Sequence, residues 1–423
     1  MLTLRYIQDF KEDVINRLKV KRFDASEIVE KIINLDNNRK ETQIESESLQ
    51  AEMNALSKKI GGLFKEGKVE EANQAKARTG ELKDQIKQYS TKLDNTEKEL
   101  QDLLVQLPNL PHTSVPEGKG EEDNEVVKTG GAMPELINPV PHWDLIRKYD
   151  LIDFELGIKI SGAGFPVYKG QGARLQRALI NFFLDEAVKA GFQEVLPPLV
   201  VNEDSGFGTG QLPDKEGQMY HVSADNLYLI PTAEVPVTNL YRNVILKSSD
   251  FPVKNCAYSA CFRREAGSWG KDVRGLNRLH QFDKVEIVQI SHPDKSYQLL
   301  DSMVAHVQSL VDKLGLPWRI LRLCGGDLSF TSALTFDFEV YSAAQERWLE
   351  VSSVSNFESF QANRLKLRFK EDGEKKTQLA HTLNGSALAL PRIVAAILEN
   401  NQTPEGIKIP DVLVPYTGFE WIK

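Results

Sequence analysis

Residues 26–107 make up a long stretch without proline that is rich in Glu, Lys, Gln, Asn and Leu. Mostly apolar side chains recur along it in alternating steps of four and three residues, which is the a/d seam of a coiled coil. A chain with this pattern is restricted to long helices that pair along one stripe. The seam residues are Leu49, Met53, Leu56, Ile60, Leu63, Leu82, Ile86, Tyr89, Leu93, Thr96, Leu100, Leu103 and Leu107.

Three glycines, Gly61, Gly62 and Gly67, interrupt the seam near its middle. Because glycine weakens a helix and permits a sharp change of direction, we expect the chain to reverse there. The result is an antiparallel hairpin of two helices of roughly 35 residues each, an arm on the order of 50 Å long. The alternative, which the composition favours, is a coiled coil that joins two chains. In a hairpin the two helices pair along their own seam, which leaves little reason for two chains to dimerise through it.

Prolines end the helical pattern at Pro108, Pro111 and Pro116, and a polar run begins at Glu117. The pattern changes from about Val126 onwards, where helix and strand signals are mixed. We therefore expect an N-terminal domain at 1–110 that contains the arm (about 26–107), a linker at 111–125 and a second domain at 126–423.

In the second domain, an amphipathic helix is predicted at 175–190 and strands at 192–201, 257–263 and 282–290. Loops and hairpins separate the strands, which favours a mainly antiparallel sheet flanked by helices over a parallel fold. The sequence has no glycine pattern of a Rossmann or P-loop nucleotide site. It thus predicts an α+β fold in which any nucleotide site is of another kind.

Composition limits the possible class of protein but does not identify a function. For 423 residues, of which 41% are hydrophobic and 26% charged, two or three soluble domains are expected. Without a run of about 18 apolar residues or a signal peptide, the expected location is cytoplasmic. Cys256, Cys261 and Cys324 form no CxxC pair, so neither disulfides nor a zinc site is expected. The net charge, 52 − 60 = −8, argues mildly against nucleic acid, although a local basic surface can still bind RNA.

The densest polar stretch, CFRREAGSWGKDVRGLNRLHQFDKVEIV, begins at Cys261 and reads as a strand, a charged loop and a second strand. Arginine suits phosphate because its planar fork can bind two oxygens, and Arg263 closes the first strand. Phe282 could stack on a base, and Glu286 lies four residues further on the same face. These residue types suit an ATP site. The alternative is a solvated charged hairpin.

A second stretch, LIPTAEVP, begins at Leu229 and follows an apolar strand. Thr232 and Glu234 flank Ala233, so both side chains point the same way if the segment is extended. A hydroxyl and a carboxylate together could hold an ammonium group. The alternative is a loop that ends in a helix cap.

A third stretch, WLEVSSVSN, places Glu350, Ser352 and Ser353 in an otherwise apolar strand. A carboxylate and hydroxyls in a sheet suggest a site for a hard cation. An exposed strand face would give the same pattern.

A fourth stretch, from His381 to Asn400, reads as a strand, a turn at Gly385 and a helix. Arg392 falls in the first part of that helix. An arginine beside the positive end of a helix can meet a phosphate tail. A surface arginine without a role is the alternative.

These four segments, in this order, resemble the class II aminoacyl-tRNA synthetases and, among them, the seryl-tRNA synthetase family. The stretches that carry the resemblance are LIPTAEVPVTNL, CFRREAGSWGKDVRGLNRLHQFDKVEIV, LEVSSVSNF and HTLNGSALALPR, and the likeness extends over nearly the whole chain. The helical hairpin is similar to that family's tRNA-binding arm. GFQEVLPPL resembles the first class II motif, which implies Pro197 or Pro198 at a dimer interface.

The resemblance implies ATP-dependent attachment of L-serine to tRNA(Ser) through a seryl-adenylate, with Mg²⁺ accompanying ATP. It also implies serylation of tRNA(Sec) where that tRNA exists. It further implies a homodimer whose arm reaches tRNA across the dimer, with no membrane association. Two other classes are less consistent with the sequence. An amino acid:carrier-protein ligase on the same core lacks the long arm, and a synthetase-like binding protein loses motif arginines, whereas Arg263 and Arg392 are present.

Residue by residue, the resemblance implies that Arg263 contacts the α-phosphate and the serine carboxylate. Phe282 would stack on adenine, with Arg392 on the other face of the base and near the γ-phosphate. Glu350 would hold Mg²⁺ with Ser353 beside it, and the implied catalytic residues are Arg263, Glu350 and Arg392. The implied serine-binding residues are Thr232, Ala233, Glu234, Arg263, Glu286, Asn384 and Ser386. The implied ATP-binding residues are Arg263, Arg264, Glu265, Phe282, Glu350, Val351, Ser352, Ser353 and Arg392.

Three positions depart from the family's commonest pattern. Trp269 stands where many members carry a smaller residue, Asn277 replaces a usual aliphatic residue, and Pro391 stands where glycine is frequent. None of these changes removes a chemical group, so they bear on the conformation of the loops rather than on activity.

Overall fold

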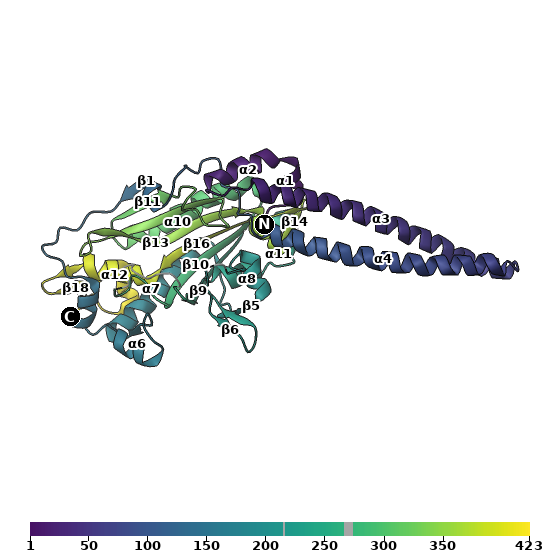
Figure 1. Ribbon diagram of the computed structural model, residues 1–423. Helices are drawn as coiled ribbons and strands as arrows, with labels where there is room; N and C mark the ends of the chain where they lie inside the picture. The colour runs from purple at the N-terminus through teal and green to yellow at the C-terminus, as the bar shows by residue number, and fades with distance from the viewer. Residues whose placement is uncertain (215, 266–273) are drawn as a thin grey trace. The chain divides into compact units, whose positions relative to one another are not determined.

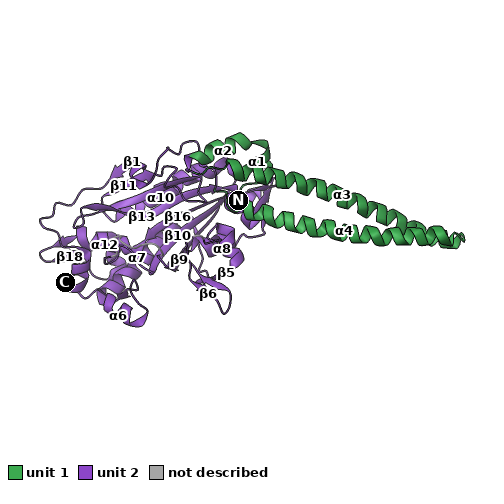
Figure 2. Ribbon diagram, viewed as in Figure 1, with its two compact units in different colours: residues 1–19, 23–108 green, residues 20–22, 109–423 purple. Residues whose placement is uncertain are grey.

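The computed structural model describes residues 1–214, 216–265 and 274–423. These residues form two compact units, one made of 1–19 and 23–108 and the other of 20–22 and 109–423 (Figure 2). In the described ranges, no helix is both long enough and apolar enough to cross a membrane. Trp269 lies outside the described residues.

The first unit is helical, and its two long helices form the predicted antiparallel hairpin (Figure 1). Each residue of the predicted seam is buried or half-buried. The α3 helix continues through Gly61 and Gly62, so the reversal lies later than those glycines suggested, at Gly67, whose φ of +75° glycine adopts without strain. The helices are α1 (Leu4–Asp9), α2 (Lys11–Val20), α3 (Ser26–Lys65) and α4 (Val69–Leu104).

A buried carboxylate fixes α1 against α3 in this unit. Asp36 is 1% exposed, and its carboxylate accepts hydrogen bonds from Gln8 at 2.7 Å and from Arg39 at 2.8 and 3.0 Å. Lys40 forms an ion pair with the same group at 2.7 Å. Burial alone would raise the pKa of Asp36, but the hydrogen bonds from Lys40, Arg39 and Gln8 outweigh it and hold the pKa below its usual range.

The second unit is built on an eight-stranded sheet in the order β1-β11-β12-β13-β16-β10-β9-β4. All neighbouring strands are antiparallel except β4 and β9, which confirms the predicted α+β fold with a mainly antiparallel sheet. The strands are β1 (Glu125–Gly130), β4 (Gln193–Glu194), β9 (Val253–Phe262), β10 (Gln281–Ser291), β11 (Trp318–Arg322), β12 (Leu334–Ser342), β13 (Arg347–Glu358) and β16 (His381–Ala389).

The two faces of this sheet have different roles. Val285 and Ile287 of β10 belong to the main apolar core, together with residues of α7 (Gly170–Lys189), α10 (Ser296–Lys313) and α12 (Leu390–Asn400). Val288 and Ile290 instead pack with α9 (Glu234–Asn239) and α11 (Ser359–Leu365). Since side chains alternate along a strand, the even-numbered residues of β10 near these positions face α9 and α11.

Shorter elements complete the second unit. Three-stranded sheets form from β5, β7 and β6, from β15, β14 and β8, and from β17, β18 and β19, and β2 pairs with β3. The helices are α5 (His142–Lys148), α6 (Phe154–Ile160), α8 (Glu203–Thr209) and α13 (Val414–Thr417), with 3₁₀ turns at 121–123, 248–250, 293–295 and 411–413. The strands are β2 (Ile152–Asp153), β3 (Val167–Tyr168), β5 (Val200–Asn202), β6 (His221–Val222), β7 (Leu227–Leu229), β8 (Ile245–Lys247), β14 (Arg368–Lys370), β15 (Thr377–Leu379), β17 (Gln402–Thr403), β18 (Gly406–Lys408) and β19 (Trp421–Ile422).

Most local predictions for this unit are confirmed. The helix at 175–190 is α7, which begins one turn earlier, and the strands at 257–263 and 282–290 are β9 and β10. The single strand predicted at 192–201 is wrong: β4 and β5 are separate, because Pro197 and Pro198 between them cannot donate to a ladder.

The turn predicted at Gly385 is also wrong, because β16 passes through this residue and α12 follows directly. A Cβ atom at Gly385 would lie 3.1 Å from a methyl carbon of Val354 on the neighbouring strand. Glycine is therefore present for close strand packing rather than for a change of direction.

Candidate functional site

Polar side chains gather on the sheet face that α9 and α11 cover. Glu286 of β10 is paired with Ser386 of β16, and Asn384 lies two residues from Ser386 on the same face. All three side chains are buried, as are Thr232 and Glu234. A group of buried polar residues on one sheet face is unusual, because each needs a hydrogen-bond partner, so their concentration here marks a site.

A β-bulge brings Glu350 and Ser353 to the same face. In a regular strand, residues three apart point to opposite faces. Here Glu350 pairs with Glu339 and Ser353 with Asp337, and the register shifts between these pairs because Val351 is an extra residue in β13. Val351 and the buried Ser352 accordingly lie on or near the core side, and the Ser352 hydroxyl donates to the carbonyl oxygen of Ser386 at 2.5 Å.

A closed triangle of polar contacts lies at the centre of the polar face. The Nζ atom of Lys284 lies 2.5 Å from Oε2 of Glu286 and donates to Oγ1 of Thr232 at 2.9 Å. The Thr232 hydroxyl donates to the same Oε2 atom at 2.9 Å. Lys284 is two residues before Glu286, so strand alternation puts both on the same face. The triangle supplies a counter-charge for a carboxylate that is only 1% exposed.

Glu234 lies next to this triangle, although not by the geometry that its sequence suggested. The segment from Thr232 is not extended: Ala233 has helical φ and ψ, α9 begins at Glu234, and the Glu234 N–H donates to Oγ1 of Thr232 at 3.2 Å. The Glu234 carboxylate accepts from Nε2 of Gln361 at 2.7 Å and also bonds to Asn384. Burial and the nearby negative charge of Glu286 raise the pKa of Glu234 to about 7.

Arg263 and Phe282 meet where β9 ends and β10 begins. The Arg263 guanidinium lies over the Phe282 ring, with its carbon 5.2 Å from the ring centroid, and donates to the Pro231 carbonyl oxygen at 3.4 Å. The side chain of Arg264 is exposed, and the backbone N–H of Arg264 donates to the carbonyl oxygen of Gln218 at 2.8 Å. Arg263 thus lies between the strand that leads to Thr232 and the predicted base-stacking residue.

Glu265 and Arg392 mark two other edges of the site. Glu265 has a φ of +51° and forms an ion pair with Arg278 at 3.1 Å. Arg392, in the first turn of α12 as predicted, donates to the Glu350 carbonyl oxygen at 2.8 Å and to the Asn277 carbonyl oxygen at 3.3 Å. Its guanidinium also lies 3.8 Å from a carboxylate oxygen of Glu350.

A second acidic residue, Asp337, adjoins the Glu350–Ser353 pair. Burial and the charge of Glu350 raise the pKa of Asp337 well above its usual range, and Ser353 hydrogen-bonds to its carboxyl group. The Oδ1 atom of Asp337 is buried without a hydrogen-bond partner. No group of three or more His, Cys, Asp or Glu residues that could hold a metal ion by themselves occurs in the described ranges.

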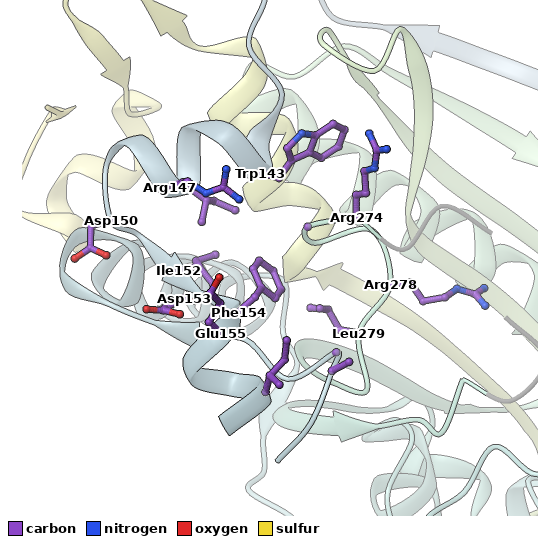
Figure 3. Close-up of a pocket in the computed structure, with 15 residues that line it drawn as sticks. Trp143, Arg147, Asp150, Ile152, Asp153, Phe154, Glu155, Arg274, Arg278 and Leu279 are labelled. Atoms are coloured by element: carbon purple, nitrogen blue, oxygen red, sulfur yellow. The ribbon is translucent and has the colours of Figure 1, made fainter. Parts of the chain in front are cut away.

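A cavity of about 760 Å³ lies beside the site rather than in it (Figure 3). In Figure 3, Asp150 and Asp153 lie on one side of it, and Arg274 and Arg278 on the other. Within the described part of the chain, none of the predicted site residues lines this cavity. Arg278, the partner of Glu265, lines this cavity, and so does Gly275, which precedes Leu276 and Asn277.

The structure therefore brings the predicted residues together in two groups. One holds the buried residues Thr232, Ala233, Glu234, Glu286, Asn384 and Ser386, and the other holds Glu350, Ser353 and Arg392. Sequence reasoning missed Lys284, Gln361 and Asp337. Strand alternation next to Glu286 could have found Lys284, whereas Gln361 is 127 positions from Glu234 and gave no local signal.

An antiparallel sheet with an arginine where two paired strands end, and a second arginine at the start of the following helix, is the core of a class II aminoacyl-tRNA synthetase. The family model of the tRNA synthetase class II core domain (G, H, P, S and T) matches residues 220–401, and that of the seryl-tRNA synthetase N-terminal domain matches residues 1–111. The chain belongs to the seryl-tRNA synthetase family, whose members are serine–tRNA ligases.

Individual relatives agree over the full length. The chain is 51% identical to a serine–tRNA ligase of Salinibacter ruber, over 99% of this chain and 98% of that protein. It is 47% identical to one of Akkermansia muciniphila, over 100% and 99%. Among solved structures, seryl-tRNA synthetase of Pyrococcus horikoshii complexed with ATP is similar, with 33% identity, a TM-score of 0.93 and coverage of 100% and 99%.

We predict that Lys284→Met destabilises the chain, because it leaves the buried Glu286 carboxylate without a counter-charge. Removing one partner of a buried ion pair lowers the free energy of unfolding by about 3–5 kcal/mol. Urea unfolding measures the change. The matched double variant, Lys284→Met with Glu286→Gln, should recover most of the loss. Equal stability of the single and double variants would contradict a charge-compensating role for Lys284.

Proposed function

We propose that the chain activates L-serine with ATP as seryl-adenylate on the polar face of the sheet and then transfers the seryl group to tRNA(Ser). The observation that carries this proposal is the buried group of Thr232, Glu234, Lys284 and Glu286, which contains two carboxylates and one lysine. If both carboxylates are ionised, the group lacks one positive charge. An amino acid's ammonium group supplies it.

In this proposal, Glu234 and Asn384 bind the ammonium group of serine, with Ala233 and Ser386 completing the wall of the pocket. The Oε2 atom of Glu286 is taken by Lys284 and Thr232, which leaves Oε1 to accept the serine hydroxyl. An ionised carboxylate is an acceptor only, so it favours a substrate with a hydroxyl donor. Alanine has no hydroxyl and would leave this oxygen without a hydrogen-bond partner. An unpaired buried acceptor gives strong discrimination against the wrong substrate.

The ATP side of the proposal uses Arg263, Phe282 and Arg392, with Arg264, Glu265 and residues 350–353 around them. Arg263 binds the α-phosphate and the serine carboxylate, and Phe282 stacks on adenine. The serine carboxylate attacks the α-phosphorus in line, and pyrophosphate leaves. Because this carboxylate is already ionised at neutral pH, no general base is needed, and acceleration comes from positioning and charge neutralisation.

Mg²⁺ fits the residues beside Arg392. Glu350 and Ser353 would hold it, since both offer the oxygen ligands that this ion prefers, and the unpartnered Oδ1 atom of Asp337 lies in the same group. Sites with one or two carboxylates are typical of Mg²⁺ that is bound mainly by substrate phosphates. When bound, the ion would supply neutralisation of phosphate charge.

In the second step, the 3′-hydroxyl of the terminal ribose of tRNA attacks the adenylate carbonyl, and AMP leaves. We propose that the α3–α4 arm binds tRNA(Ser), and that tRNA(Sec) is serylated in the same way where it exists. We also propose a homodimer that acts in the cytoplasm, where the tRNA substrate is found, with the arm reaching tRNA across the dimer. The exposed apolar residues Leu196, Leu199 and Val200, which flank Pro197 and Pro198, support an interface there.

Serine-dependent pyrophosphate exchange tests the activation step. Glu286→Ala should lower exchange about tenfold to a hundredfold, because a charge-assisted hydrogen bond to the serine hydroxyl is lost, and it should leave ATP affinity nearly unchanged. Glu286→Gln keeps the shape and an acceptor oxygen, so it should lose less. Near-normal exchange by Glu286→Ala at saturating serine would exclude Glu286 from the serine pocket.

Shortening the arm tests the tRNA proposal. Glu45 and Tyr89 hydrogen-bond across the hairpin, so residues 46–88 can be replaced by a short glycine-rich turn that joins facing positions. The shortened chain should keep serine-dependent pyrophosphate exchange and lose most aminoacylation. For the complete chain, tRNA affinity should fall as salt rises, because phosphate contacts release counterions. Unchanged tRNA charging by the shortened chain would rule out the arm as the tRNA-binding element.

The pKa of Glu234 predicts how serine binding depends on pH. Below about pH 7 the carboxyl group is protonated, and it must lose its proton before it can pair with an ammonium group. The KM for serine should therefore rise as pH falls below about 7, by up to about tenfold per pH unit, and level off above it. The charged groups that face Glu234 are Glu286 and Lys284, while Gln361 and Asn384 are neutral.

The control for this prediction is the KM for ATP, which should change little over the same range. Glu234→Gln cannot titrate, so its KM for serine should be higher and nearly independent of pH between about 5.5 and 8. A flat serine profile for the unaltered chain would show that Glu234 does not change its charge when serine binds.

A further inference from the structure

A path of buried and partly buried hydrogen bonds runs from the last turn of α12 back to the guanidinium in its first turn. It begins at Glu399, whose side chain is fully buried. Oε1 of Glu399 accepts from the backbone N–H of His142 at 3.0 Å and from its Nδ1 at 2.7 Å. The same atom accepts from Nε2 of Gln345 at 3.2 Å. Oε2 accepts from the Ser342 hydroxyl and from the Ala344 N–H.

The hydrogen bonds of His142 determine its tautomer. Its Nε2 atom accepts from the Leu276 N–H at 2.9 Å, so the ring proton is on Nδ1 and points at Glu399. The backbone beside Leu276 comes very close to the ring: a Cβ atom at Gly275, where φ is +58°, would lie 2.3 Å from Nε2. The φ favours glycine there, and this approach leaves no room for a Cβ atom. His142 thus holds one side of the segment 275–277.

Gln345 holds the other side of that segment. Its Oε1 atom accepts from Nδ2 of Asn277 at 3.0 Å, and its Nε2 atom donates to Glu399. The carbonyl oxygen of Asn277 then receives the Nε–H of Arg392 at 3.3 Å. An aliphatic side chain at 277 could not form the link to Gln345. The side-chain amide of Asn277 therefore fixes residue 277, and the backbone carbonyl oxygen of the same residue orients Arg392.

Glu399 is a locally unfavourable choice. An acidic residue in the last turn of a helix opposes the helix dipole, and burial penalises its charge. Its hydrogen bonds outweigh the effect of burial and hold the pKa of Glu399 below its usual range, so it is an ionised acceptor inside the fold. A local conflict of this kind is expected where a residue is present for placement of a functional group rather than for stability.

We propose that Glu399, His142, Gln345 and Asn277 form a positioning network that orients the Arg392 guanidinium and thereby sets the affinity for ATP. The network rests on the proposed role of Arg392 as an ATP ligand. It touches neither the serine pocket nor the reacting atoms, so its members act through Arg392 alone. A change in the network should therefore weaken ATP binding and leave serine binding unchanged.

Gln345→Ala tests the network, because it cuts the path between Glu399 and Asn277 at a side chain that is only partly buried. ATP affinity, measured by calorimetry on the full chain, should weaken about tenfold, and serine affinity should change less than about twofold. In an Arg392→Ala background, the same substitution should have almost no further effect on ATP, because residues that act through one another are not additive. Asn277→Leu should behave like Gln345→Ala.

Gln402→Ala is the matched control. Gln402 follows the same end of α12 and bonds to both the N–H and the carbonyl oxygen of Val140. It also donates to the backbone carbonyl oxygen of Glu399 at 2.8 Å, but these bonds are not part of the side-chain path to Arg392. It should leave the affinity for ATP unchanged. Unaltered ATP affinity in Gln345→Ala, an equal loss for serine, or an equal loss in the Arg392→Ala background would each overturn the network. Absence of serine-dependent pyrophosphate exchange in the unaltered chain would instead defeat the proposed function.

Discussion

A carboxylate that is buried in a protein needs a counter-charge and hydrogen bonds, and the site depends on how Glu286 obtains them. Lys284 and Thr232 both bind the same oxygen of Glu286. Lys284 reaches it because strand alternation puts residues 284 and 286 on one face. Thr232 reaches it because the chain turns at Ala233 into α9. The second oxygen of Glu286 has neither of these partners, and in the proposed function it selects the hydroxyl of serine.

The sheet supplies the rest of the site by the same alternation, with one interruption. Core residues of β10 and β16 alternate with polar residues, so the apolar face packs on α7, α10 and α12 while the polar face is directed toward α9 and α11. The bulge at Val351 is what allows Glu350 and Ser353 to share the polar face. Residues built on neighbouring strands are held more rigidly than residues on loops, which suits chemistry that depends on positioning.

Sequence reasoning predicted the elements better than it predicted the site. The heptad seam predicted the α3–α4 hairpin, and local strand patterns rich in apolar residues predicted β9, β10 and β13, because these signals are local. The identity of the site residues came from resemblance, and their geometry did not follow from it. The helical turn at Ala233 and the bulge at Val351 break the periodicity that the predictions used. Gln361 and Asp337 depend on tertiary contacts that no local pattern reports.

Three departures from local rules lie beside the proposed nucleotide site. Glu265 adopts a φ of +51° without being glycine, Asp337 buries an oxygen without a partner, and Glu399 places a charge in the last turn of a helix. Each choice reduces stability by itself, so the surrounding fold must hold it in place. All three lie at the proposed nucleotide site. Glu265 is one of the residues assigned to ATP, Asp337 adjoins Glu350 and Ser353, and Glu399 leads to Arg392. Positive φ angles and unpartnered buried atoms also occur elsewhere, for example at Glu358 and Gln289. It is therefore the contacts of Glu265, Asp337 and Glu399, rather than the broken rules themselves, that connect these residues to the proposed nucleotide site.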